Sequence, residues 1–190
     1  MPAIQRISDR HALADLVALD RDDLPVLIVA AEEKEAGPIV LASYLEVLKA
    51  IRRDIPFVIL ANAREMTIYR KDRTRSLEPI ATIPTAEILS FYDPDYPQRW
   101  TSKGYLVARI DSWLRDLMRH WKSPEPPATG VLRTIGLADR LERGWLKRGV
   151  RLACLPVRGD ELPDELRDWA EPGHGRYPLE ATPIPSADHS

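Results

Sequence analysis

ADLVAL at positions 14–19, DRDD at 20–23 and LPVLIVAAEEK at 24–34 follow one another near the start of the chain. Two apolar runs joined by a polar turn predict a β-hairpin. The second run ends on three consecutive charges, Glu32, Glu33 and Lys34. Because side chains alternate across a strand, Glu32 and Lys34 are expected on one face and Glu33 on the other. With Asp15 facing the same way on the neighbouring strand, a carboxylate from each strand and one ammonium would meet at a sheet edge.

This trio can bind a divalent metal and activate water. The carboxylates of Asp15 and Glu32 are hard oxygen ligands that suit Mg²⁺, which keeps most of its waters and can orient one for attack. Lys34 beside that water would stabilise the developing oxyanion or help to deprotonate the nucleophile, and it would do so better if burial lowered its pKa. A charged run at a strand end is otherwise typical of a solvated terminus.

The residues after the hairpin predict an α/β fold. Pro38 and an apolar stripe predict a helix over 38–53, and the continuous apolar run 57–61 is typical of a strand buried on both faces. A neighbouring strand is expected at 66–70. A hairpin, a helix on its face and a returning strand predict a mixed sheet in three layers. Before the hairpin, residues 3–12 predict a short helical turn capped by Ser8 or Asp9.

The second half of the chain is expected to be mainly helical. Helices are predicted from positions 84–87 to Tyr92, at 104–121 and at 131–143, with an irregular proline-containing linker at 123–129 and one more strand at 150–157. Proline, acidic residues and weak periodicity predict a loosely ordered tail at 159–190. Residues 1–158 are therefore expected to form a single domain.

The hairpin also resembles a known family. Asp15-Leu16-Val17 before the turn, and Pro25-Val26-Leu27 leading to Glu32-x-Lys34 after it, resemble the core of the PD-(D/E)XK, or restriction-endonuclease-like, superfamily. The similarity covers roughly residues 12–72, and it is greatest to uncharacterised bacterial members and to the N-terminal nuclease domain of type I restriction motor subunits. It implies a restriction-endonuclease-like mixed sheet flanked by helices, here with additional C-terminal helices, and DNA cleavage with Mg²⁺ or Mn²⁺.

The resemblance implies which residues form the site. Asp15, Glu32 and Lys34 would be catalytic, and the two carboxylates would hold the metal together with the carbonyl oxygen of Glu33. The middle residue of the family motif is normally apolar because it faces the core, whereas here it is Glu33. With Glu35 it forms a second acidic pair on the opposite face, and a shift of one residue would exchange the two faces.

Composition limits the partners of the chain. Its net charge of -2 gives no global attraction to nucleic acid, so any such contact has to come from a local basic surface. The candidates are the paired arginines Arg52 and Arg53, and the basic run that contains Arg70, Lys71 and Arg73. Such charges are also typical of a solvated face or of a hairpin tip.

The cysteine, the histidines and the apolar runs of the chain bear on its cellular compartment and on the metals that it could bind. A single cysteine, Cys154, cannot form an internal disulfide, which is typical of the reducing cytoplasm. The absence of a signal-like segment and of an apolar run near 20 residues argues against secretion and membrane spanning. The four histidines lack metal-ligand spacing, so no zinc site is expected.

Two functions remain open at this point. One is a Mg²⁺-dependent DNA endonuclease or nuclease domain in a restriction, defence or mobile-element setting. The other is a catalytically inactive restriction-endonuclease-like module that binds a protein partner, and a homodimer fits either. They differ in whether Asp15, Glu32 and Lys34 converge on one point with room for a metal.

Overall fold

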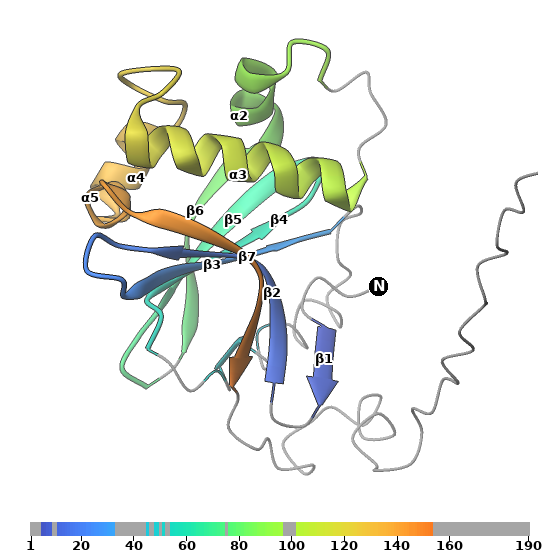
Figure 1. The fold of residues 1–190 in the computed structure, drawn as a ribbon, viewed down its shortest axis with the longest axis vertical. Coiled ribbons are helices and arrows are strands. Elements are labelled where there is room, and N and C mark those ends of the chain that lie inside the picture. Colours follow the sequence, from blue (N-terminus) through green and yellow to red (C-terminus); the bar gives the residue numbers. More distant parts are fainter. Residues whose placement is uncertain are drawn as a thin grey trace, which may run out of the picture. The chain divides into compact units, whose positions relative to one another are not determined.

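The two strands predicted near the start of the chain form a hairpin in the computed structural model (Figure 1). Strands β2 (His11–Leu19) and β3 (Pro25–Ala31) are antiparallel, with Leu16 opposite Val29. The turn is closed by the Asp20 carboxylate, which accepts hydrogen bonds from the amides of Asp22 (2.9 Å) and Leu24 (3.0 Å). Aspartate favours such turns because its side chain bonds the backbone a few residues ahead. The predicted hairpin is confirmed.

The structure describes residues 5–8, 11–32, 45, 48–49, 51, 54–74, 76–96 and 102–153. The chain divides into two compact units, Met1–Pro156 and Val157–Ser190. The second unit, and with it the predicted tail, lies outside the described residues. So do Glu33, Lys34, Arg52 and Arg53, and most of the predicted helix at 38–53, of which Leu45, Leu48 and Lys49 are described and helical.

The described strands form one mixed sheet. Along the sheet, β1 (Gln5–Ser8), β2, β3, β4 (Phe57–Ala61), β5 (Glu65–Lys71) and β6 (Leu77–Pro84) follow one another, and β7 (Trp145–Ala153) also pairs with β2. Since β7 pairs with β2 along its whole length, β1 and β3 share the other edge of β2, each beside a different part of it. Among the described strands only β3 and β4 are parallel. The predicted strands at 57–61 and 66–70 are confirmed.

The sheet buries a hydrophobic cluster on each face. One cluster lies under α3 (Lys103–Arg119) and also includes residues of α2 (Thr85–Tyr92), α4 (Thr129–Thr134) and α5 (Ala138–Leu141). Figure 1 shows α3 lying across the sheet. The apolar stripe of this helix is buried in the cluster: Leu106, Ile110, Trp113, Leu114 and Leu117. The cluster on the other face contains Leu48, Ile51 and Ile55. An α/β fold with a mixed sheet flanked by helices is therefore confirmed.

Two expectations for the strands were wrong or incomplete. Residues 5–8 and 11–13 are antiparallel strand partners instead of a helical turn, because β7 pairs with β2 as far as His11. That pairing joins His11 to Ala153, so local sequence carries no sign of it. Strand β6 was not predicted, because its two prolines, Pro79 and Pro84, interrupt the sequence pattern that is typical of a strand.

The predicted helix at 131–143 is two short helices, α4 and α5, separated at Gly136, which has a φ of 77°. Strand β7 begins at Trp145, earlier than predicted, and directly follows Gly144. A Cβ atom at Gly144 would lie 2.2 Å from the carbonyl oxygen of Leu19. Only glycine therefore allows the chain to pass so close to β2 before it enters β7.

Candidate functional site

Asp15 interrupts the regular alternation of β2. Ala14 and Val17 pack in the cluster on the Leu48 face, whereas Leu16 packs in the cluster under α3. Strand β7 accommodates this irregularity at Gly149, where φ is 57°. The carboxylate of Asp15 consequently turns toward the end of β3 and the start of α3.

The Asp15 carboxylate is bonded through both oxygens. Its Oδ2 accepts a hydrogen bond of 2.9 Å from the amide of Ala31, the last residue of β3. Its Oδ1 forms an ion pair with the Lys103 Nζ at 3.0 Å. The Asp15 side chain is 15% exposed and that of Lys103 is 30% exposed, so the pair lies at the border between core and solvent.

Lys103 belongs to this site, and sequence reasoning missed it. It is the first residue of α3, directly after Ser102, whose hydroxyl accepts a hydrogen bond from the amide of Tyr105. A lysine in the first turn of a helix is unusual, because the helix dipole favours acidic residues there. The unusual position of this lysine could have indicated a special role for it, but nothing in the sequence connects Lys103 to Asp15.

Glu32 lies at the same end of the sheet as Asp15. Its amide donates to the carbonyl oxygen of Ala61 at 2.8 Å, which continues the parallel pairing of β3 with β4 by one residue. Its side chain is half-buried. The structure thus brings Asp15 to the amide that directly precedes Glu32.

Strand alternation bears on which glutamate accompanies Asp15. Ala30 packs in the cluster on the Leu48 face and Ala31 in the cluster under α3. If this alternation continues, Glu33 and not Glu32 follows Ala31 on the α3 face. Glu33 and Lys34 lie outside the described residues. The assignment of Glu32 and Lys34 to the site therefore stays a prediction, and so does the alternative in which Glu33 faces Asp15.

The donor set fits a small divalent cation. Mg²⁺ is commonly bound through one or two carboxylates and completes its shell with water. Asp15 and one acid from positions 32–33 would supply that number, and each carboxylate oxygen has a second lone pair beyond the hydrogen bond that it accepts. Within the described residues, no group of three or more His, Cys, Asp or Glu side chains is arranged to hold a metal.

Two of the residues predicted to contact nucleic acid, Arg70 and Lys71, are bonded elsewhere in the fold. Lys71 is buried, and its ammonium donates to the carbonyl oxygens of Leu48 and Ile51, both at 3.3 Å. Arg70 donates to the carbonyl oxygen of Ile135 at 2.6 Å. Arg73 is exposed in the turn between β5 and β6.

These residues also lie far from Asp15 along the sheet. Arg70 pairs with Phe57 at the start of β4, whereas Ala31, the neighbour of Asp15, pairs with Ala61 at its end. Four residues along a strand correspond to about 13 Å. The structure therefore does not bring Arg70, Lys71 or Arg73 to Asp15, contrary to the expectation that they grip phosphates beside it.

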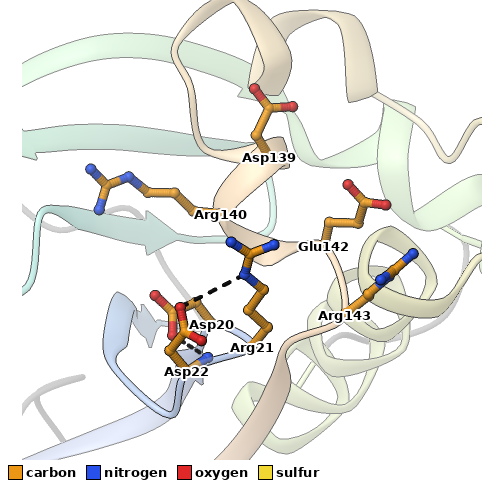
Figure 2. Close-up of a pocket in the computed structure, with 7 residues that line it drawn as sticks. All are labelled: Asp20, Arg21, Asp22, Asp139, Arg140, Glu142 and Arg143. Carbon is orange, nitrogen blue, oxygen red and sulfur yellow. Dashed lines mark hydrogen bonds and ion pairs between the residues drawn. The ribbon is translucent and has the colours of Figure 1, made fainter.

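A depression of about 460 Å³ lies at the other end of the hairpin, between the β2–β3 turn and α5 (Figure 2). It is lined by charged residues alone: Asp20, Arg21, Asp22, Asp139, Arg140, Glu142 and Arg143. Arg21 extends toward Asp22, with the Nε–Oδ2 distance at 3.7 Å. Small-molecule sites are mostly apolar with few polar groups, so this depression lacks their character.

Two buried acids of α3 stabilise the fold. Asp116 is fully buried and accepts hydrogen bonds from the Tyr92 hydroxyl and the Lys122 amide, both at 2.7 Å. Burial, together with this bond to Asp116, raises the pKa of Tyr92. Asp111 joins α3 to β7 through Arg148 at 2.6 Å and also pairs with Arg115 at 3.0 Å.

Comparison of the chain with family models, with curated proteins and with solved structures found no match. Its function therefore has to be argued from the chemistry of its own residues. In the part of the chain that the structure describes, no helix combines the length and the apolar character that crossing a bilayer requires.

Proposed function

We propose that this chain is a restriction-endonuclease-like nuclease domain that hydrolyses phosphodiester bonds in DNA with Mg²⁺ or Mn²⁺, in a restriction, defence or mobile-element setting. The observation that carries the proposal is the position of Asp15. Its carboxylate bonds the last amide of β3, directly before the acidic run 32–33, with the Lys103 ammonium 3.0 Å away. Carboxylates and a cation at one sheet edge are what metal-dependent hydrolysis requires.

The residues of the chain would divide the work as follows. Asp15 and an acid from positions 32–33 hold the cation, and when bound it orients a water and neutralises charge on the phosphate. Lys34 would act on the attacking water. Lys103, on the α3 side of Asp15, would stabilise negative charge that develops on the phosphate oxygens.

Lys103 also competes with the cation for Asp15. Its ammonium contacts the Oδ1 atom, which is the oxygen that bears no backbone hydrogen bond. A lysine ammonium is a compact charge on a flexible stem, and this one is partly exposed, so it can move away at small cost. Movement of Lys103 from Asp15 to the phosphate would couple cation binding to substrate binding.

DNA cleavage by site variants tests the proposal. Supercoiled plasmid, linear duplex and single-stranded DNA are incubated with the full chain and Mg²⁺ or Mn²⁺. Asp15→Asn should remove most activity, by about 100-fold or more, and so should Lys34→Ala if Glu32 and Lys34 share the face of Asp15. Combined variants should lose little beyond the single ones. Glu32→Gln and Glu33→Gln, tested separately, decide which face carries the second acid.

Asp22→Asn is the matched control, because Asp22 is an exposed aspartate in the turn at the other end of the hairpin. It should cleave like the wild type. Cleavage by Asp15→Asn at the wild-type rate would refute the site.

A catalytically inactive module that binds a protein partner is the second candidate function. It is favoured by the two protein donors that Asp15 already has, one on each oxygen. A folded wild-type chain that binds neither cation and leaves every DNA substrate intact would support it.

A further inference from the structure

Basic residues outnumber acidic residues in one segment of the chain. Residues 102–153 contain eleven Lys and Arg against five Asp and Glu, although the whole chain has 27 against 29. This segment forms α3, α4, α5 and β7. The net charge of the chain therefore conceals a strongly basic part.

The imbalance is larger at the surface of this segment. Nine of the eleven basic residues are exposed, whereas only three acids are exposed. Asp111 and Asp116 are buried, and Asp111 offsets one charge of the exposed pair Arg115 and Arg148. The carboxylate of Asp116 is bonded to a tyrosine hydroxyl and to backbone amides, so it neutralises no surface charge.

Five arginines of this surface follow one another in space. Arg148 on β7 and Arg115 on α3 share the Asp111 carboxylate. Arg119 lies one turn further along α3, about 6 Å from Arg115. Arg143 donates its amide to the carbonyl oxygen of Met118, beside Arg119.

Arg140 completes the series from α5. It lines the charged depression together with Arg143 and with four acids, Asp20, Asp22, Asp139 and Glu142, and Figure 2 shows the Arg140 and Arg143 guanidinium groups on opposite sides of the depression. In Figure 1 the C-terminal end of α3 lies beside α4 and α5. We call this series the arginine band: Arg115, Arg119, Arg140, Arg143 and Arg148.

We infer that the arginine band binds the phosphate backbone of a nucleic-acid duplex. Guanidinium groups match phosphate geometry through paired hydrogen bonds and are weakly hydrated, which makes arginine the preferred residue for backbone contacts. A duplex presents a continuous line of charges, one per about 1.7 Å of its axis, and suits an extended row of arginines. This inference rests on the proposed function only for the identity of the nucleic acid as DNA.

The distance between the arginine band and Asp15 limits how one duplex can contact both. Lys103, which contacts Asp15, and Arg115 are twelve residues apart on the same helix, or about 18 Å. That distance corresponds to about five base pairs at 3.4 Å each. The two residues also lie about 120° apart around the helix axis, so a duplex that contacts both the band and the sheet edge at Asp15 would have to cross α3 obliquely.

Duplex binding without cleavage tests the inference. The anisotropy of a labelled duplex of about 20 base pairs is measured with the full chain in EDTA at increasing salt. Arg119→Gln/Arg143→Gln should lower the affinity by about 10-fold or more at low salt, and should reduce the slope of log K against log salt by about 2, since each lost phosphate contact accounts for about 0.9.

Arg133→Gln/Lys147→Gln is the control, because it removes the same charge from exposed basic residues of α4 and β7 that lie outside the band. It should change the affinity less than about 3-fold. Arg119→Lys/Arg143→Lys should retain most of the salt slope, and thermal unfolding checks that every variant is folded. Equal weakening by the two Gln pairs would overturn the inference.

Two further measurements separate this inference from its alternatives. Asp15→Asn should bind the duplex at least as tightly as the wild type, because it releases Lys103 and removes a negative charge, so loss of cleavage would refute neither the band nor its test. Polyglutamate of similar charge should compete weakly with the duplex. Competition as strong as that of unlabelled duplex would identify an acidic protein surface as the partner and overturn the nucleic-acid assignment.

Discussion

Asp116 on α3 and Asp15 on β2 are both aspartates with protein donors on both oxygens, yet their surroundings differ. Asp116 is fully buried, and its donors are a core tyrosine and the backbone amides of Lys122 and Ser123. Asp15 lies at a sheet edge, and one of its two donors is a partly exposed lysine.

The difference separates a carboxylate that stabilises the fold from one that can exchange its partner. Backbone amides and a packed tyrosine cannot leave Asp116 without local unfolding. The ammonium of Lys103 can leave Asp15 by rotation about its side-chain bonds. An acid with a replaceable donor is suited to bind a cation, whereas an acid with fixed donors is not.

Removal of the Asp116 carboxylate should have the largest effect on stability. Asp116→Ala leaves the Tyr92 hydroxyl and two amides without their acceptor, so we expect the free energy of unfolding to fall by about 3 kcal/mol. Urea unfolding of Asp116→Ala beside Asp15→Ala measures the contrast. Equal losses of unfolding free energy in Asp116→Ala and Asp15→Ala would contradict the difference between the two aspartates.

Gly144→Ala should cost somewhat less. The added Cβ would lie 2.2 Å from the Leu19 carbonyl oxygen and would push the start of β7 away from β2, for a loss of about 2 kcal/mol. Gly130→Ala in α4 is the matched control, since no atom lies within 4 Å of its added Cβ. Thermal unfolding should place the control at or above the wild type, and a Gly144→Ala midpoint equal to that of the control would contradict the close approach.

Asp111 should make stability depend on acid pH. Burial raises its pKa, but the hydrogen bonds and charges of Arg148 and Arg115 outweigh burial, so that its pKa lies below the ordinary value. The unfolded state therefore binds more protons, and this stabilisation is complete above about pH 4 and is lost as pH falls through the lower folded pKa.

Asp111→Asn removes this titration. We expect the variant to be less stable at pH 7 by about 1–2 kcal/mol and to lose less stability than the wild type below about pH 4. Urea unfolding between pH 2.5 and pH 7 gives the two curves. Parallel curves throughout this interval would show that the arginines do not hold Asp111 ionised.

Lys103→Met should have the smallest effect on stability. An ion pair at the border of solvent contributes about 1 kcal/mol or less. Because the variant removes a cation that competes for Asp15, its affinity for Mn²⁺ should rise by about 3-fold to 10-fold. Lys147→Met, an exposed lysine of β7, is the control for charge. Weaker Mn²⁺ binding by Lys103→Met than by the control would show that Lys103 supports the site instead of competing for it.

Local sequence patterns predicted the elements whose burial is indicated by the spacing of their own apolar residues. The apolar run 57–61 and the stripe along α3 are of this kind. The extent of β2 and the start of β7 depend on partners far away in the chain, such as His11 and Ala153, and could not be derived locally. Strand β1 pairs in turn with this extended part of β2.

The same limit applies to the site. The position of Asp15 beside the end of β3 followed from the hairpin, because antiparallel neighbours are close in sequence. The contribution of Lys103 did not, because only the packing of α3 on the sheet brings it to Asp15. The arginine band likewise arises from the meeting of α3, α5 and β7.

The central claim is that Asp15 binds a divalent cation, and calorimetric titration of the full chain with Mn²⁺ tests it most directly. The wild type and Asp22→Asn should show saturable binding with the same affinity. Asp15→Asn should bind about 10-fold more weakly or worse while its thermal midpoint stays within a few degrees, since its loss affects few fixed contacts. Unchanged Mn²⁺ binding by Asp15→Asn, or no binding by the folded wild type, would contradict the account.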